Sequence, residues 1–141
     1  MQRASGDTIE VWDNNAGAWS TTLANATPID STIPQLLSAS APAIALDADD
    51  NVYVAFLREG TTGGNNNCWL SKLSAAGVLT TWDDGASSMT TNLAAPTAET
   101  DSIGRNSAAG FDVNGTPSIA IDSAGDVYVA FSQNTLTTNL N

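Results

Sequence analysis

Three oxygen-bearing side chains, Asp47, Asp49 and Asn51, stand at alternate positions of one short segment. This is the spacing of a calcium-binding loop, in which alternating oxygens converge on one hard cation. A related segment has Asp122 and Ala124 at its first two positions, so its central oxygen ligand is missing. Because both segments keep the first aspartate, capping of a tight turn by Asp47 and Asp122 explains the pair better. Calcium is an alternative for the first segment alone, and no other cofactor is expected.

Residue types that commonly perform nucleophilic or acid–base catalysis are scarce. The chain has no histidine and one cysteine, Cys68. Within this chain, these counts exclude histidine catalysis, Ser-His-Asp triads, zinc sites of cysteine and histidine, and an intrachain disulfide. We therefore predict no catalytic residues and no enzyme activity, and we expect Cys68 to be a small buried hydrophobic side chain.

The chain is strongly acidic. Its 141 residues include 15 Asp and Glu against 4 Lys and Arg, which gives a net charge of -11. A phosphate-binding surface needs clustered cations, whereas the four in this sequence are scattered. No apolar run reaches the ~18 to 20 residues that span a bilayer. We therefore expect neither nucleic acid nor a membrane as a partner.

A fifteen-residue segment occurs twice. PAIALDADDNVYVAF at 42–56 returns as PSIAIDSAGDVYVAF at 117–131, with nine of fifteen positions identical and an offset of 117 − 42 = 75. A fainter similarity relates the segment that begins at Ile9 to the one that begins at Trp69, an offset of 69 − 9 = 60. Together these repeats cover most of the chain and define its organisation.

Each repeated segment predicts a β-hairpin. In the first type, apolar Ile44 and Leu46 alternate with alanine, a polar turn follows at 47–51, and a β-branched and aromatic run closes the hairpin. The second type has strands at 68–73 and 78–82 around a turn containing glycine. Helical periodicity is absent, and the five prolines are expected in connectors rather than in strands. The predicted class is therefore all-β.

With the strands of the first hairpin type named A and B, and those of the second C and D, the chain has the order CD, AB, CD, AB. We interpret residues 1–141 as a single module of about two four-stranded antiparallel units. Its predicted parts are a half-unit at 8–22, a complete unit at 42–83, a half-unit at 117–132, and connectors at 23–41 and 84–116.

The two motifs together resemble a known family. The pattern P-x-I-A-[IL]-D, four turn residues and V-Y-V-A-F, followed after a gap by S-x-x-G-x-x-T-T-W, is similar to the blades of sialidase-like β-propellers with Asp-box hairpins, and of related bacterial propeller repeats. The resemblance implies that each four-stranded unit is a propeller blade. The Asp-box itself departs from the family, since Ser74 to Gly77 lacks the aspartate and Asn15 stands at its place in the other copy.

The resemblance also implies a ligand face, formed by the B-to-C loop at 57–67 and the long connector. The candidate ligand-binding residues on it are Arg58, Glu59, Asn65, Asn66, Asn67, Asp101 and Arg105. Solvated loop charges are the alternative interpretation. A sialidase would need three arginines, a Tyr/Glu nucleophilic pair and an aspartic acid. Tyr53 and Tyr128 lie inside predicted strands, where they are expected to pack rather than react.

Four tryptophans fall in the predicted C and D strands, and they are Trp12, Trp19, Trp69 and Trp82. An aromatic face suits the C–H face of a sugar ring, so stacking on a glycan is one interpretation. Packing within and between blades is the other, and it is the one that we expect.

Two blades do not close a propeller, which typically has ~4 to 8. The leading CD hairpin and the trailing AB hairpin are complementary halves of one blade, which a second copy would complete by edge pairing; three copies would give six blades. We therefore predict a homo-oligomeric, non-catalytic unit for structural assembly or for recognition of a glycan or polymer, its ring completed by self-association or by further sequence. Few lysines and abundant Thr, Ser, Asn and Gly favour an extracellular or cell-surface location. The alternatives are a fragment of a sialidase-type glycoside hydrolase and a scaffolding repeat of an extracellular surface or filament assembly.

Overall fold

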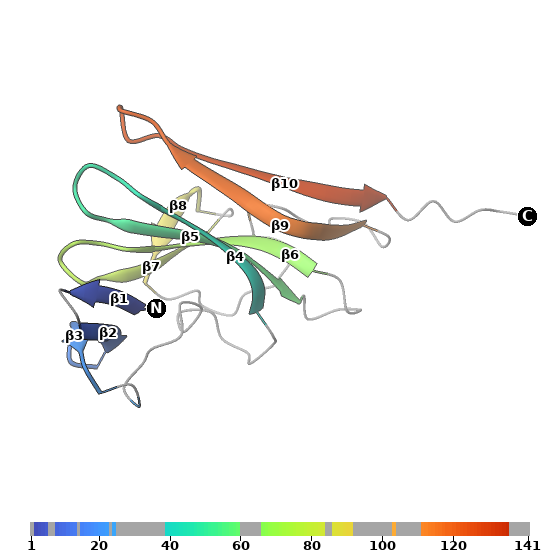
Figure 1. The fold of residues 1–141 in the computed structure, drawn as a ribbon. Helices are drawn as coiled ribbons and strands as arrows, with labels where there is room; N and C mark the ends of the chain where they lie inside the picture. The colour runs from blue at the N-terminus through green and yellow to red at the C-terminus, as the bar shows by residue number, and fades with distance from the viewer. Residues whose placement is uncertain are drawn as a thin grey trace, which may run out of the picture.

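The computed structural model describes residues 2–5, 8–13, 15–22, 24, 39–59, 66–83, 86–91, 103 and 111–135. These residues form ten β-strands and no α-helix, so the all-β class predicted from the sequence is confirmed. The strands make three open antiparallel sheets, which follow one another along the chain (Figure 1).

The central sheet has five strands, each paired with the next along the chain: β4 (Ala39–Leu46), β5 (Val52–Glu59), β6 (Asn66–Leu73), β7 (Leu79–Asp83) and β8 (Ser88–Thr90). The first four are the strands predicted for the unit at 42–83. Strand β8 lies inside the predicted connector 84–116 and was not predicted, because a three-residue strand shows too little alternation. It extends the sheet through pairs such as Trp82 with Met89.

The second copy of the repeat forms a two-stranded sheet of β9 (Phe111–Ile121) and β10 (Val127–Thr135). Its register reproduces that of the first copy, because Ile119 pairs with Val129 as Ile44 pairs with Val54. Both hairpins also shift register after the fourth residue pair from the turn. The repeat seen in the sequence is therefore a repeat of hydrogen-bonding pattern as well as of residue type.

The N-terminal sheet contains β1 (Gln2–Ser5), β2 (Thr8–Asp13) and β3 (Ala18–Ser20) in that order. The hairpin of β2 and β3 is the one predicted at 8–22. Strand β1 was not predicted, and it pairs with β2 along the edge that β3 leaves open. Strand β1 therefore occupies the edge of β2 on which a trailing hairpin of another copy was expected to pair.

Two prolines occupy strands, which corrects the expectation that prolines fall only in connectors. Pro42 lies in β4 and Pro117 lies in β9. In β4 the register shifts between Ser40 and Ala43, and Ala41 has a φ of 51°, so Pro42 sits in an irregular stretch of the outermost strand of its sheet. Edge strands and bulges are the positions that tolerate a residue without an N–H group.

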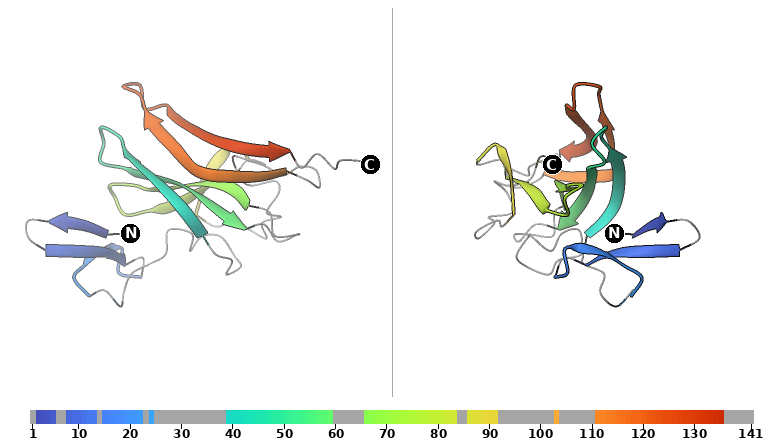
Figure 2. Two further views of the ribbon diagram at one scale, coloured as in Figure 1. Left: turned by 45° about the vertical axis from the view of Figure 1, so that its right-hand side comes forward. Right: turned by 90° about the vertical axis from the view of Figure 1, so that its left-hand side faces the viewer.

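The core lies between the layers, and Figure 2 shows the hairpin β9–β10 and the N-terminal sheet on opposite sides of the central sheet. On one side Tyr53, Ala55 and Leu70 are buried, and four aliphatic residues of the second hairpin pack against them, Ile119, Ile121, Val127 and Val129. On the other side Trp12 of β2 is buried with Leu73 and Leu79. Burial of these apolar surfaces is the main stabilising contribution to the stack.

Candidate functional site

The predicted ligand loop is shorter than the sequence suggested. Strand β5 continues through Arg58 and Glu59, and β6 begins at Asn66, so these residues belong to strands and not to the B-to-C loop. Arg58 pairs with Asn67, and Glu59 with Asn66. The strands extend because the backbone continues its antiparallel ladder into polar residues, a continuation that alternation of side chains does not reveal.

Two of the candidate ligand-binding residues are buried. The side chain of Arg58 is 3% exposed and that of Asn67 is 1% exposed. Both take part in interactions with neighbouring groups of the protein. The structure thus brings Arg58 and Asn67 together, but it places them inside the protein and not on an open face. Their role in ligand binding stays a prediction, and the other candidates, Asn65, Asp101 and Arg105, lie outside the described residues.

The turn between β4 and β5 is organised by Asp47. Its Oδ1 accepts hydrogen bonds from the backbone N–H groups of Asp49, at 3.0 Å, and Asn51, at 2.9 Å. Its Oδ2 accepts one from the Asn51 side-chain amide at 2.7 Å, which is the main reason that the pKa of Asp47 lies below its usual value. The predicted capping of the turn by Asp47 is confirmed.

The same hydrogen bonds bear on the calcium alternative. The amide nitrogen of Asn51 is directed to Asp47, and its Oδ1 accepts a hydrogen bond from the N–H of Ala75 at 3.0 Å. The oxygen of Asn51 that a cation would need is thus used to join this turn to the one between β6 and β7. Throughout the part of the chain that the structure describes, no group of three or more His, Cys, Asp or Glu is placed to hold a metal ion.

The second copy repeats the turn. Asp122 Oδ1 accepts hydrogen bonds from the N–H groups of Ala124, at 2.9 Å, and Asp126, at 3.0 Å. The hydroxyl of Tyr128 donates to Asp122 Oδ2 at 3.1 Å. The backbone hydrogen bond from Asp126 is the largest cause that lowers the pKa of Asp122. Packing was predicted for Tyr128, but its side chain is exposed. Its hydroxyl stabilises the turn through the hydrogen bond to Asp122 instead.

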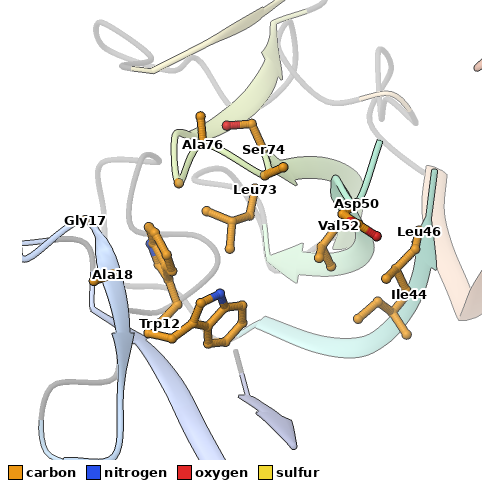
Figure 3. A pocket seen from close by; sticks show the side chains of 13 residues that line it. Trp12, Gly17, Ala18, Ile44, Leu46, Asp50, Val52, Leu73, Ser74 and Ala76 are labelled. Atoms are coloured by element: carbon orange, nitrogen blue, oxygen red, sulfur yellow. The ribbon is translucent and has the colours of Figure 1, made fainter. Parts of the chain in front are cut away.

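A cleft that sequence reasoning missed lies between the N-terminal and central sheets. It has a volume of about 780 Å³, in the range of clefts that hold small ligands. Its walls include Trp12 and Trp19, whose rings meet edge to face with centroids 5.6 Å apart. Ile44 and Leu46 line the other side, as Figure 3 shows. Segments far apart in the sequence form this cleft, so no local motif could reveal it.

The described lining of the cleft has few groups that could take part in catalysis. Asp50 is the one ionisable side chain among its described lining residues. Glycoside hydrolysis generally requires two carboxyl groups that flank the scissile bond, and a lone carboxylate does not make such a pair. What the cleft offers is an apolar surface with the Trp12 and Trp19 rings on one wall, and such a surface suits packing against another apolar or ring-shaped group.

Two of the tryptophans and the cysteine are core residues. Trp69 is 1% exposed and Trp12 is 4% exposed, in agreement with the expected packing role. Cys68 is fully buried, and desolvation raises the pKa of its thiol to about 12. A thiol of this kind stays protonated at neutral pH and is a poor nucleophile.

Comparisons of the chain with protein-family models, with curated proteins and with solved structures find no match. Among the described residues, none belongs to a helix with the length and apolar character needed to cross a membrane.

Proposed function

We propose that this chain is a non-catalytic β-propeller unit that serves structural assembly, as part of a ring that its own two blade equivalents do not close. One observation carries the proposal: the second copy of the repeated hairpin packs on the face of the sheet that contains the first copy. Blades of a propeller stack in this face-to-face manner around an axis.

The packing of each layer supports a radial arrangement. The central sheet buries Tyr53 and Ala55 on one face and Val54 and Phe56 on the other. A small sheet that is apolar on both faces needs a neighbour on each side. In the proposed assembly three copies supply six blades, or further sequence supplies the missing ones.

The side chains of the proposed unit support its non-catalytic character. The chain has no histidine, and Asp50 is the one carboxylate among the described residues that line the cleft between the sheets. The alternative of a sialidase-type glycoside hydrolase would need catalytic groups from a neighbouring copy or from further sequence. The few lysines and the abundance of Thr, Ser, Asn and Gly favour an extracellular or cell-surface setting for the assembly.

Recognition of a glycan or polymer is a second candidate function, favoured by the cleft with Trp12 and Trp19. The half-buried indole of Trp19, which packs against the buried Trp12, and the exposed side chains of Ile44 and Leu46 form a surface on which the C–H face of a sugar would stack. The predicted ligand residues Arg58 and Asn67 would need to become accessible to contribute.

Native mass spectrometry tests the assembly, with a glycan array and fluorogenic glycosides run on the same sample. Assembly predicts a multiple of the 14.5 kDa chain mass, with three chains favoured, and no turnover. A folded protein that keeps the mass of one chain at high concentration would rule out a ring of identical copies. An array signal without turnover supports recognition, and glycoside turnover overturns the non-catalytic assignment.

A further inference from the structure

Two large apolar side chains of β4 are open to solvent. Ile44 is 59% exposed and Leu46 is 61% exposed. They lie on one face of β4, and we call them the aliphatic surface. Their equivalents in the second copy, 75 residues later, are Ile119 and Ile121, which are half-buried against the cluster of Tyr53, Ala55 and Leu70. The same hairpin face is therefore packed in one copy and uncovered in the other.

On the opposite hairpin face, the first copy is buried and the second copy is exposed. Tyr53 of the first copy is 8% exposed, because the second hairpin and Lys72 of β6 cover it, whereas its equivalent Tyr128 is 57% exposed. Ala120 pairs with Tyr128 across the hairpin, and Ala130 lies two residues further along β10; both are exposed. We call Ala120, Tyr128 and Ala130 the tyrosine surface. It is the equivalent of a face that the chain already buries once.

We propose that the tyrosine surface of one copy of this chain docks on the aliphatic surface of the next, which repeats between chains the contact that the two hairpins make within one chain. This inference rests on the proposed function and identifies the surfaces through which the copies would join. The partner is a second copy, because the chain contains both halves of the contact. The face with Tyr128 would meet Ile44 and Leu46 as the cluster that contains Tyr53 meets Ile119 and Ile121.

The contact is head to tail, so each copy keeps one surface of each kind for further neighbours. Such a heterologous contact closes into a ring when the rotation per copy allows it, and otherwise continues as a filament. The contact uses faces of the hairpins and leaves the paired edges unchanged. This matters because β1 already pairs with β2, on the edge where a trailing strand of another copy would otherwise add.

The position of the aliphatic surface also supports a hairpin of a second copy as the group that docks there. Ile44 and Leu46 line the open cleft beside Trp12 and Trp19 of the N-terminal sheet. A docked second hairpin from another copy would lie beside that sheet, so that the two together cover the same face of the central sheet.

The net charge of the chain affects how strongly two copies associate. Each copy carries a net charge of -11, so copies repel one another at long range. Salt screens this repulsion and also strengthens apolar burial when the salt is a sulfate. Association through these surfaces should therefore increase with ionic strength, unlike association through ion pairs.

Charged substitutions of the two surfaces test the inference by native mass spectrometry and light scattering. Leu46→Glu places a carboxylate in the contact, and Tyr128→Glu does so on the other side. Val78→Glu is the matched control, since Val78 is 47% exposed and belongs to neither surface. We expect each of the two surface variants to associate about 100-fold more weakly than the unmodified chain, and the control to associate as the unmodified chain does.

A mixture of the two variants gives the sharper result. The Leu46→Glu chain keeps its tyrosine surface, and the Tyr128→Glu chain keeps its aliphatic surface, so mixing them restores a single contact. We expect a heterodimer of twice the 14.5 kDa chain mass and no larger species. Oxidation of an Ile44→Cys, Tyr128→Cys double variant should in addition give covalent multimers, whereas the Val78→Cys, Tyr128→Cys pair should not.

The outcomes separate the two proposals. If the unmodified chain forms oligomers that Leu46→Glu and Tyr128→Glu leave intact, the surfaces named above are wrong while assembly stands. If the unmodified chain stays a folded monomer at high protein and salt concentration, both this inference and the ring of identical copies are wrong. Large species in the variant mixture would also overturn the head-to-tail contact.

Discussion

Tyr53 and Tyr128 hold the same place in two copies of one hairpin, yet the side chain of Tyr53 is 8% exposed and that of Tyr128 is 57% exposed. Tyr53 pairs with Ala45, and Tyr128 pairs with Ala120, in the same register. Their difference in burial has two sources. The second hairpin packs on the cluster that contains Tyr53, and Lys72 of the neighbouring strand β6 lies over the Tyr53 ring, with its Nζ 5.0 Å from the ring centroid. Tyr128 lies in a sheet of two strands, and no described residue packs on it in the same way.

The two tyrosines should therefore respond differently to truncation. Tyr53→Ala removes a buried ring and should lower the free energy of unfolding by about 3 kcal/mol. Tyr128→Ala removes an exposed ring and one hydrogen bond to Asp122, and should lower it by less than about 1 kcal/mol. Denaturant unfolding of dilute protein, in which association does not contribute, measures both values. Equal losses would contradict the packing of the second hairpin on the first.

Gly77 lies in the turn between β6 and β7 with a φ of 84°, and a Cβ there would collide with the indole of Trp12. Gly77→Ala should cost about 1 kcal/mol for backbone strain and about 1 to 3 kcal/mol more for the collision. Gly125→Ala is the control, because Gly125 has a φ of 89° and open space where the Cβ would lie. Thermal unfolding and tryptophan fluorescence of both variants measure the difference. If Gly125→Ala is equally destabilised, Trp12 does not pack against this turn.

Ser71 and Thr81 share a hydrogen bond of 2.9 Å between their hydroxyl oxygens, and both side chains are fully buried. Ser71→Ala and Thr81→Val should each lower the free energy of unfolding by about 1 kcal/mol or more. The double variant should lose less than the sum, with a coupling of about 0.5 to 1.5 kcal/mol. The pair Ser71→Ala and Thr80→Val is the control, and its losses should add, because Thr80 donates to the carbonyl of Lys72 instead.

The hydrogen bond between Tyr128 and Asp122 predicts linked titrations. Asp122 has a pKa below its ordinary 3.8, so it stabilises the fold at pH values above 3.8, and this stability is lost as the pH falls through the lowered value. Asp122 raises the pKa of Tyr128 above its ordinary 10.0, so that contribution is present below pH 10.0 and is lost as the pH rises through the raised value.

Asp122→Asn should move the titration of Tyr128 back toward its ordinary pKa, as followed by the ultraviolet absorbance of tyrosinate. It should also reduce the loss of stability in acid, because the carboxylate that titrates has been removed. Asp49→Asn in the equivalent first turn is the control and should leave the titration of Tyr128 unchanged. An unchanged titration in Asp122→Asn would show that the hydrogen bond is absent in solution.

The sequence predicted those parts of the fold that depend on local patterns. Alternation around Ile44 and Leu46, and the aspartates at 47 and 122, were sufficient to predict the hairpins and their turn caps. Strands β1 and β8 were missed because short polar strands form by pairing with a neighbour and not from their own residue pattern. The continuation of β5 into Arg58 has the same cause, since a ladder of backbone hydrogen bonds extends regardless of side-chain polarity.

The candidate site was harder to predict than the fold. Arg58 and Asn67 were placed on an open loop because the resemblance to propeller blades implied one there, and the structure buries both, although such side chains usually face water. The cleft beside Trp12 depends on how separate sheets pack, and no spacing within one segment encodes that. The uneven exposure of Tyr53 and Tyr128 depends on layers in the same way, although their equivalence was visible in the repeat.

Pro42 has a further consequence for how this protein avoids aggregation. It lies in the outermost strand of the central sheet, next to Ala41 with its left-handed backbone. Proline has no N–H group to donate, and the irregular backbone at Ala41 interrupts the row of backbone donors and acceptors. An incoming strand would need that row to pair with β4. Pro42 thus protects the β4 edge, which lies beside the exposed Ile44 and Leu46, from pairing with an incoming strand, and its replacement by a strand-forming residue would remove that protection.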